Sequence, residues 1–341
     1  MGKTKTPTVF DRSHWGRIRL TGADRVRFLH NQTTNNIEQL SPGQGCHSVF
    51  VTSTGRTIDL ASVYVLEDAL LTVVSPGMDQ QLYDWMDRYI FFSDKVTLTN
   101  ESKQTCMFTI LGDDAGALRE LPGVESGVGI ETSKAVFQDI PKAVSDGMLS
   151  HHTLQMFGEA CLVIANSGLG LPGYTVIGPS SIAEALMSAL TQVGVRVGTA
   201  QQWETLRIAQ GRPMPGQELT DDDNPLEAGL WNSISFEKGC YIGQETIARL
   251  NTYQGVKKRL WGLLLENPVA VGAVITHEGE KVGRLTSLAP LINESETQTL
   301  GLGYIRTKAG GEGLTVDIEG TQATVVAVPF IEHTYYTAKS Q

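Results

Sequence analysis

Long apolar runs, closely spaced cysteines and an excess of basic residues are all missing from this 341-residue sequence. No stretch of about 18 apolar residues occurs, which argues against a helix that spans a membrane. The first twenty residues contain no apolar segment of the kind that a secretory signal needs. The four cysteines include no C-x-x-C pair, which argues against a disulfide framework and favours a reducing compartment. We therefore expect a cytoplasmic protein that has no membrane partner.

Acidic residues outnumber basic ones, 37 to 27, and the net charge is −10. Surfaces that bind phosphates carry a basic excess, so we expect no direct contact with nucleic acid. Metal ligands are also poorly arranged, because adjacent side chains such as His151 and His152, or Cys46 and His47, diverge in a strand. Four scattered cysteines do not suit an iron–sulfur cluster held by one chain alone. The sequence predicts no metal site.

The patterns that are present include both strands and helices, and the length of the chain predicts two or three units. Apolar alternation predicts strands over residues 18–20, 49–52, 58–66, 70–74, 96–98, 106–111, 161–165 and 174–177. Helical spacing predicts helices over residues 24–30, 82–90, 114–120, 182–193 and between Thr199 and Gly211. Their predicted starts are a cap at Thr21 and two capping boxes, Ser181 with Glu184 and Thr199 with Gln202.

Beyond Tyr253 the pattern changes to short strands joined by tight turns, with no helix. The predicted strands cover residues 259–265, 273–276, 281–287, 299–306, 314–318 and 323–330, with turns at 277–279 and 319–320. Closely spaced antiparallel strands have to hide their edges, so we predict a small barrel. We place a boundary near residue 255, which separates a region over 1–255 from a barrel over 256–341.

A glycine pattern at Gly168, Gly170 and Gly173 satisfies G-x-G-x-x-G after the strand at 161–165. A dinucleotide site needs a helix directly after the glycines, because the helix N-terminus holds the pyrophosphate. Here Pro172 interrupts the loop and the next segment has a strand pattern. We therefore reject a nicotinamide cofactor.

Three segments outside the core patterns offer polar groups. Residues 31–36, NQTTNN, form either a solvated loop or a set of amides directed at a polar heterocycle. Arg207, near the end of its predicted helix, is either a solvated cation or a buried anchor for an anionic ligand. Residues 211–229 are rich in proline, glycine and acids, and long loops of this kind are typically functional or disordered.

The densest group of reactive side chains is KGCYIGQE, residues 238–245. Gly239 and Gly243 can take positive φ or allow another backbone or a ligand to come close, and we expect a short helix to begin near Gln244. Cys240 then lies on a turn, two residues after Lys238, where a cation and helix N–H groups favour a thiolate. The alternative is a small buried cysteine, and local chemistry gives the two about even weight.

KGCYIGQE followed by TIAR, residues 246–249, resembles the signature of the YgfZ family, folate-binding relatives of the glycine-cleavage T-protein. The resemblance extends along nearly the whole chain and is closest to the cyanobacterial and plastid branch. Seven other segments of the chain each resemble a segment of the family and occur in the same order as in the family: LTGADRVRFLHNQTTNNI, RYIFFSDKVTL, WETLRIAQGRPMPGQEL, NPLEAGLWNSISF, KVGRLTSLAP, LGYIR and PFIEHTYYT.

The resemblance implies an α+β, T-protein-like folate-binding body of two intertwined lobes around a central cavity, followed by the antiparallel barrel. It implies tetrahydrofolate, or a one-carbon derivative, as cofactor and iron–sulfur client proteins or their assembly machinery as partners. In bacteria the family is also linked to tRNA thio-modification. Carried over by position, Cys240 is the key thiol. The cofactor-binding positions are Asn35, Asp59, Arg207, Gln210, Lys238, Tyr241, Gln244, Glu245 and Arg249.

Two departures from the T-protein pattern bear on the reaction. Where T-proteins have two adjacent carboxylates, this chain has Asp59 and Leu60. Where they have a glutamate that grips the pterin, it has Ala209 followed by the neutral Gln210. Losing a charge-assisted hydrogen bond costs about 1.5–3 kcal/mol, so we expect weaker folate binding than in a T-protein.

Two hypotheses follow. The first, which we weight about threefold over the second, is a folate-binding accessory factor for iron–sulfur cluster assembly or repair that uses Cys240. The second is a folate-dependent transferase of aminomethyl type with an unknown acceptor. General acid–base catalysis contributes about 10²–10⁴-fold in rate. Because one of the two carboxylates is missing here, the first hypothesis is favoured over the second. A third alternative is a scaffold with a vestigial pocket.

Overall fold

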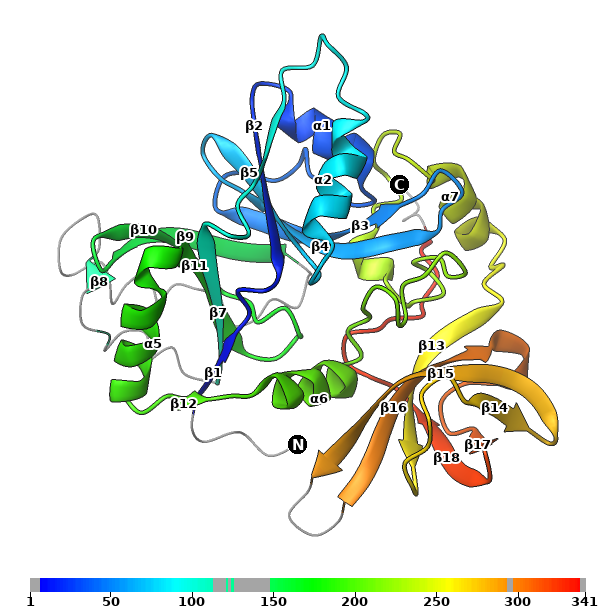
Figure 1. Ribbon diagram of the computed structural model, residues 1–341. Coiled ribbons are helices and arrows are strands. Elements are labelled where there is room, and N and C mark those ends of the chain that lie inside the picture. The colour runs from blue at the N-terminus through cyan, green and yellow to red at the C-terminus, as the bar shows by residue number, and fades with distance from the viewer. Residues whose placement is uncertain (1–6, 113–120, 122–123, 126–147, 293–296, 338–341) are drawn as a thin grey trace. The chain divides into compact units, whose positions relative to one another are not determined.

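The computed structural model describes residues 7–112, 121, 124–125, 148–292 and 297–337 (Figure 1). It divides into two compact units, each assembled from three segments of the chain. Unit 1 comprises residues 1–30, 36–48 and 61–200, and unit 2 comprises 31–35, 49–60 and 201–341. The barrel region belongs to unit 2, and the predicted division at residue 255 stays a prediction.

Within the described residues, twelve strands form one sheet, most of which lies in unit 1. In spatial order they are β12 (Arg196–Val197), β1 (Thr8–Asp11), β7 (Thr105–Leu111), β11 (Gly173–Pro179), β10 (Glu159–Ile164), β9 (Met148–Met156), β3 (Gln44–Val51), β4 (Thr57–Val65), β5 (Ala69–Val74), β2 (Gly16–Thr21) and β6 (Thr97–Asn100), with β8 (Val124–Glu125) paired to β9. β1 and β12 are parallel, whereas β7, β11, β10 and β9 pair antiparallel in turn.

A helix covers one face of this sheet. α5 (Ala183–Gln192) follows a short 3₁₀ turn, η1 (Ser180–Ile182), and presents Leu186 and Leu190, four residues apart, to the core. These leucines pack with Phe108 of β7 and Val163 of β10, all of them buried. The antiparallel pairing of β10 with β11 confirms that the glycine pattern after β10 joins two strands, as predicted.

Several predicted helix boundaries are wrong. Thr21 is the last residue of β2, and α1 (Arg25–Gln32) begins only at Arg25. Ser181 lies within η1, and no side chain caps α5, because the 3₁₀ turn leads into this helix. α2 (Asp79–Asp87) ends before residues 88 and 89, which form a turn, and does not reach Ile90. The helix predicted over 114–120 lies outside the described residues.

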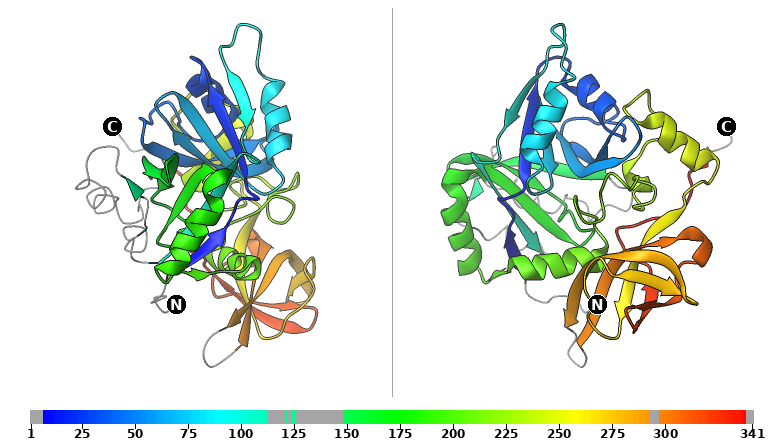
Figure 2. Two further views of the ribbon diagram at one scale, coloured as in Figure 1. Left: turned by 60° about the vertical axis from the view of Figure 1, so that its left-hand side comes forward. Right: turned by 45° about the vertical axis from the view of Figure 1, so that its right-hand side comes forward.

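In unit 2, six antiparallel strands close into a barrel, which confirms the C-terminal prediction and the α+β class. Their order is β13 (Lys258–Leu265), β16 (Thr297–Arg306), β15 (Glu280–Ile292), β14 (Val274–His277), β17 (Thr315–Ile318) and β18 (Thr321–Val326), and Figure 2 shows them from two directions. β13 pairs with both β16 and β18, so the sheet closes. Inward residues such as Leu263, Ile275 and Val325 fill the interior.

The two tight turns predicted in the barrel are present. Glu278 and Gly279 have φ of 52° and 80°, and Glu319 and Gly320 have φ of 51° and 83°. Positive φ at both central residues is typical of the two-residue hairpin turn that matches strand twist.

Among the described residues, no helix is both long enough and apolar enough to span a membrane.

Candidate functional site

The KGCYIGQE segment leads into α7 (Gln244–Thr252), as predicted. Gly243 precedes the helix with a left-handed φ of 81°. A Cβ added at Gly243 would lie 2.5 Å from the Thr52 carbonyl oxygen, so the segment rests directly on the backbone of residue 52. Gly239 does not have positive φ, and an added Cβ there would have no neighbour within 4 Å, so no other backbone comes close. The close approach of a ligand at Gly239 stays a prediction.

Cys240 is exposed, whereas Cys46, Cys106 and Cys161 are buried. Burial raises the pKa of the Cys106 thiol and raises that of Cys161 to about 12. Buried thiols of this kind are poor nucleophiles and poor metal ligands, because the reactive form is the thiolate. Because Cys240 is exposed, the alternative of a small buried cysteine is wrong, and Cys240 is the one thiol of the four that solvent can reach.

Lys238 fixes the segment two residues before that thiol. Its ammonium is buried and donates hydrogen bonds to the carbonyl oxygens of Thr33, at 2.7 Å, and Asn35, at 2.8 Å. The same nitrogen lies 4.9 Å from the centre of the Tyr241 ring. Carbonyls and a ring face satisfy a buried cation that would otherwise be costly. The polar stretch over residues 31–36 and the KGCYIGQE segment, far apart in sequence, are thus joined.

The remaining members of the segment divide between a buried and an exposed side. Tyr241 is buried, and burial raises the pKa of its phenol, so it stays protonated. Gln244 lies 3.5 Å from the Lys238 carbonyl oxygen, to which its amide donates. Glu245 and Arg249 lie on the exposed side of α7, opposite the buried Ile247. Their predicted role in cofactor binding stays a prediction.

Asp59 and Gln210 are both buried in unit 2. Asp59 lies on β4, and the next residue, Leu60, accepts a hydrogen bond from buried Arg212 through its carbonyl oxygen at 3.2 Å. Gln210 ends α6 (Ala200–Gln210), and its carbonyl oxygen accepts from the Phe330 amide at 2.8 Å. Their predicted role as cofactor contacts stays a prediction.

Arg207, the other predicted contact on α6, is buried and ion-paired within the protein. Its guanidinium donates to both carboxylate oxygens of Glu204, at 2.6 and 2.9 Å, and to Glu218 at 3.1 Å. Further bonds reach Gln217 and Ser287. Burial alone lowers the pKa of Arg207, but the hydrogen bonds it donates to Glu204 and the charge of Glu218 raise it overall, so it stays charged. Arg207 is therefore not a solvated cation: it is bound to the carboxylates of Glu204 and Glu218. Its predicted role as an anchor for an anionic ligand stays a prediction.

The family model for the GCVT N-terminal domain matches residues 4–238. The chain belongs to the GCVT family.

Similar members of the GCVT family cover most of the chain. A protein of Arabidopsis thaliana, whose name gives it as a chloroplastic transferase, is 42% identical over 325 residues, which are 95% of this chain and 71% of the relative. An aminomethyltransferase of Picosynechococcus is 28% identical over 94% of this chain and 86% of its own. The crystal structure of the glycine cleavage system aminomethyltransferase T from Bartonella henselae has a TM-score of 0.76 at 20% identity, over 97% and 88% of the two chains. That likeness establishes the fold.

One part of the site in this GCVT-family chain was not predicted from the sequence. The C-terminal segment over residues 328–337 carries Tyr336, whose ring stacks on Phe236 with centroids 5.2 Å apart. The Tyr336 hydroxyl donates to Glu237, directly before Lys238. Asn251 of α7 holds the Tyr336 backbone on both sides, through its amide nitrogen and its oxygen, each at 2.9 Å. The adjacent tyrosines in PFIEHTYYT are the one sequence signal for this contact.

We expect Asn251→Ala to loosen the segment that precedes Cys240. The substitution removes both bonds to Tyr336 and a third from the Trp231 indole at 3.3 Å, so local opening becomes easier by about 1–3 kcal/mol. Hydrogen exchange of peptides covering residues 235–243 should accelerate correspondingly. Asn232→Ala, which changes an exposed asparagine of the same unit, is the control and should leave exchange unchanged. Equal exchange in both variants would show that the C-terminal segment does not hold the loop.

Proposed function

We propose that this protein is a folate-binding accessory factor that acts through the Cys240 thiol in the assembly or repair of iron–sulfur clusters in client enzymes. The observation that carries the proposal is the exposure of Cys240, alone among the four cysteines. Its loop is anchored by the buried Lys238 on one side and by α7 on the other. The resemblance of KGCYIGQE to the YgfZ signature supports the same role. In bacteria, cluster enzymes that thiolate tRNA are candidate clients.

Folate binding is proposed from the family and from the donor groups in unit 2. Asp59 supplies a buried carboxylate and Gln210 a buried amide, the kinds of group that hydrogen-bond a pteridine ring. Asn35 belongs to the segment that Lys238 holds in place. Arg207 fits less well, because its donors are bound to Glu204 and neighbouring acceptors, so we leave it out of the proposed contacts. Tetrahydrofolate, when bound, would itself carry a one-carbon group.

The chain's own residues would then act in sequence on an iron or sulfur cargo. Lys238 keeps the loop in place through backbone carbonyls, so the loop need not order itself when the cargo arrives. Cys240 binds iron through its sulfur with loss of the thiol proton, takes sulfane sulfur from a persulfide donor that leaves as a thiol, or exchanges with a client disulfide from which the second cysteine leaves as a thiol. The exposed Glu245 and Arg249, one turn apart on α7, offer charges to the client surface. We propose that the protein acts in the cytoplasm, whereas the name of the Arabidopsis relative places that protein in the chloroplast.

Cys240→Ala is expected to abolish this role while leaving folate binding within about twofold of the wild type, because exposed substitutions seldom change stability by more than about 0.5 kcal/mol. In a deletion strain the variant should fail to restore aconitase-type activity. Titration of both proteins with tetrahydrofolate and its formyl and methylene forms measures binding. Thr252→Ala, an exposed change at the end of the same helix, is the matched control and should restore activity fully. Full rescue by the alanine variant at Cys240 would end the proposal.

A second candidate is a folate-dependent one-carbon transferase of aminomethyl type, favoured by the names of relatives such as the Picosynechococcus aminomethyltransferase. Under this function the purified protein changes the one-carbon state of tetrahydrofolate in the presence of an amine or thiol donor. Asp59→Asn should then remove turnover, because the remaining carboxylate of the usual pair is lost, while Cys240→Ala should retain it. Loss of turnover in Asp59→Asn but not in Cys240→Ala would therefore favour the transferase, and loss of rescue in Cys240→Ala would favour the accessory factor.

A further inference from the structure

Unit 1 contains a cavity of about 780 Å³ that neither the thiol segment nor the proposed folate contacts line. Two sections of the curved sheet face each other across it. Residues of β9, β10 and β11 form one side, and residues of β2, β5 and the β4–β5 turn form the other. Pockets for small organic ligands typically have volumes of about 300–1,000 Å³, so the cavity is of ligand size.

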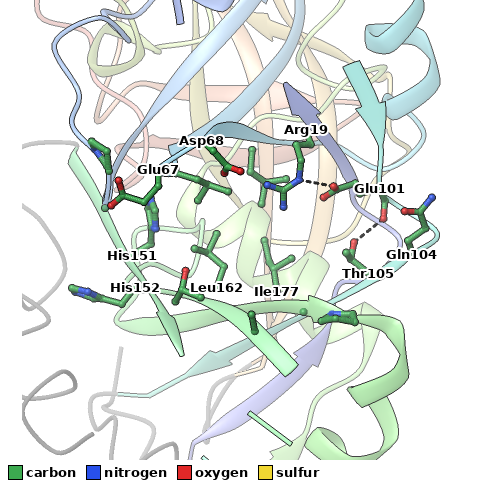
Figure 3. A pocket seen from close by; sticks show the side chains of 18 residues that line it. Arg19, Glu67, Asp68, Glu101, Gln104, Thr105, His151, His152, Leu162 and Ile177 are labelled. Carbon is green, nitrogen blue, oxygen red and sulfur yellow. Dashed lines mark hydrogen bonds and ion pairs between the residues drawn. The ribbon is translucent and has the colours of Figure 1, made fainter. Parts of the chain in front are cut away.

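One side of the cavity is apolar. Leu162 of β10 and Ile177 of β11 are directly paired across the two strands, so their side chains lie next to each other on one face. Leu71 of β5 adds a third aliphatic group. Figure 3 shows Leu162 and Ile177 together along one side, with the labelled charged groups Arg19, Asp68 and Glu101 along the other. The cavity is therefore amphipathic, with room for a hydrocarbon body.

The charged side carries an excess of carboxylates. Arg19 is ion-paired with Glu101, with 2.5 Å between Nε and Oε1. Glu67 and Asp68 occupy the turn between β4 and β5, and among the described residues neither takes part in an ion pair. Arg25 donates to the Glu67 carbonyl oxygen at 3.2 Å but pairs with neither of these carboxylates. Among the lining residues, carboxylates therefore outnumber cations by two.

His151 does not offset this charge. Its imidazole is buried and its Nε2 lies 3.1 Å from the Val65 carbonyl oxygen, to which it donates. Burial lowers the pKa of His151, so the ring is neutral at neutral pH. An anionic ligand would meet three lining carboxylates and one guanidinium that is already paired, whereas a cation would meet two carboxylates, Glu67 and Asp68, that are in no ion pair among the described residues.

We propose that this cavity binds a small aliphatic amine. Its ammonium group lies at the carboxylates of Glu67 and Asp68, and its hydrocarbon chain lies along Leu71, Leu162 and Ile177. The apolar pair and the acidic turn come from different parts of the chain, and both line the same cavity. The proposal stands independently of Cys240 and of folate.

Hexylamine, hexanol and hexanoate are suitable probes, because they share one chain length and differ in head-group charge. We expect hexylamine, added to the full-length protein with methyl-labelled leucine and isoleucine, to shift the methyl NMR signals of Leu162 and Ile177 saturably. Hexanoate should bind at least about tenfold more weakly, because its charge is repelled by the same carboxylates. Salt should weaken hexylamine binding through screening and leave hexanol binding unchanged.

A double variant tests the acidic turn. Glu67→Gln with Asp68→Asn should weaken hexylamine binding about threefold to tenfold, the range for two partly exposed ion pairs, and leave hexanol binding unchanged. Glu278→Gln with Glu280→Gln removes two exposed carboxylates at a barrel hairpin and should change nothing. Equal binding of hexanoate and hexylamine, shifts outside the cavity, or an unaffected double variant would each overturn the proposal.

Discussion

Unit 2 of the Arg207→Met variant is expected to be less stable than the wild type by about 3–5 kcal/mol. Arg207 and Glu218 form an ion pair in which the two side chains are 1% and 0% exposed. Methionine approximates the length of the arginine stem but leaves the Glu218 carboxylate buried without its cation. Thr286 and Ser287 still donate to Glu218, but hydroxyls do not replace a full positive charge.

Urea unfolding followed by tryptophan fluorescence measures this loss, since Trp203, Trp231 and Trp261 all belong to unit 2. Arg88→Met, which removes an exposed arginine at the end of α2, is the matched control and should change stability by no more than about 0.5 kcal/mol. Adding Glu218→Gln to the Arg207 variant should recover about 1–2 kcal/mol, because the uncompensated charge disappears. A loss below 1 kcal/mol in the single variant would contradict the structural role of this ion pair.

The barrel and most sheet strands were predictable because their signals are local. Period-two alternation identifies strands such as β13, and glycine at a two-residue turn, as at Gly279 and Gly320, identifies a hairpin. Helix starts were less predictable. The box at Ser181 fits the sequence rule, but the chain enters α5 through a 3₁₀ turn, which makes the side-chain cap unnecessary.

The candidate site was predictable only where its groups are neighbours in sequence. KGCYIGQE identified the loop, the helix start and the cysteine, but not the contact of Lys238 with Thr33, which spans 205 residues. The bond between Asn251 and Tyr336 spans 85 residues and has no periodic signal. Arg207 had two interpretations because no local pattern shows that Glu218, within a loop, folds back onto it. Contacts of long sequence separation depend on the whole topology.

The second large effect concerns Gly243, where we expect alanine to destabilise unit 2 by about 2–5 kcal/mol. A left-handed φ costs an L-residue about 1–2 kcal/mol, and Gly243 has a φ of 81°. The remainder arises from overpacking, which typically costs about 1–3 kcal/mol. The new Cβ would lie 2.5 Å from the Thr52 oxygen and 3.1 Å from the Gly55 Cα, both backbone atoms, so either α7 or the β3–β4 turn has to move.

Gly239→Ala is an unusually close control, because it makes the same substitution in the same eight residues. Gly239 has no positive φ, and an added Cβ would contact nothing within 4 Å, so stability should stay within about 0.5 kcal/mol of the wild type. Unfolding in urea compares the two variants, and hydrogen exchange over residues 238–245 shows whether the loop moves. If the two alanine variants are equally stable, the segment does not rest on the backbone at Thr52, and Cys240 is not held in a fixed position by the start of α7.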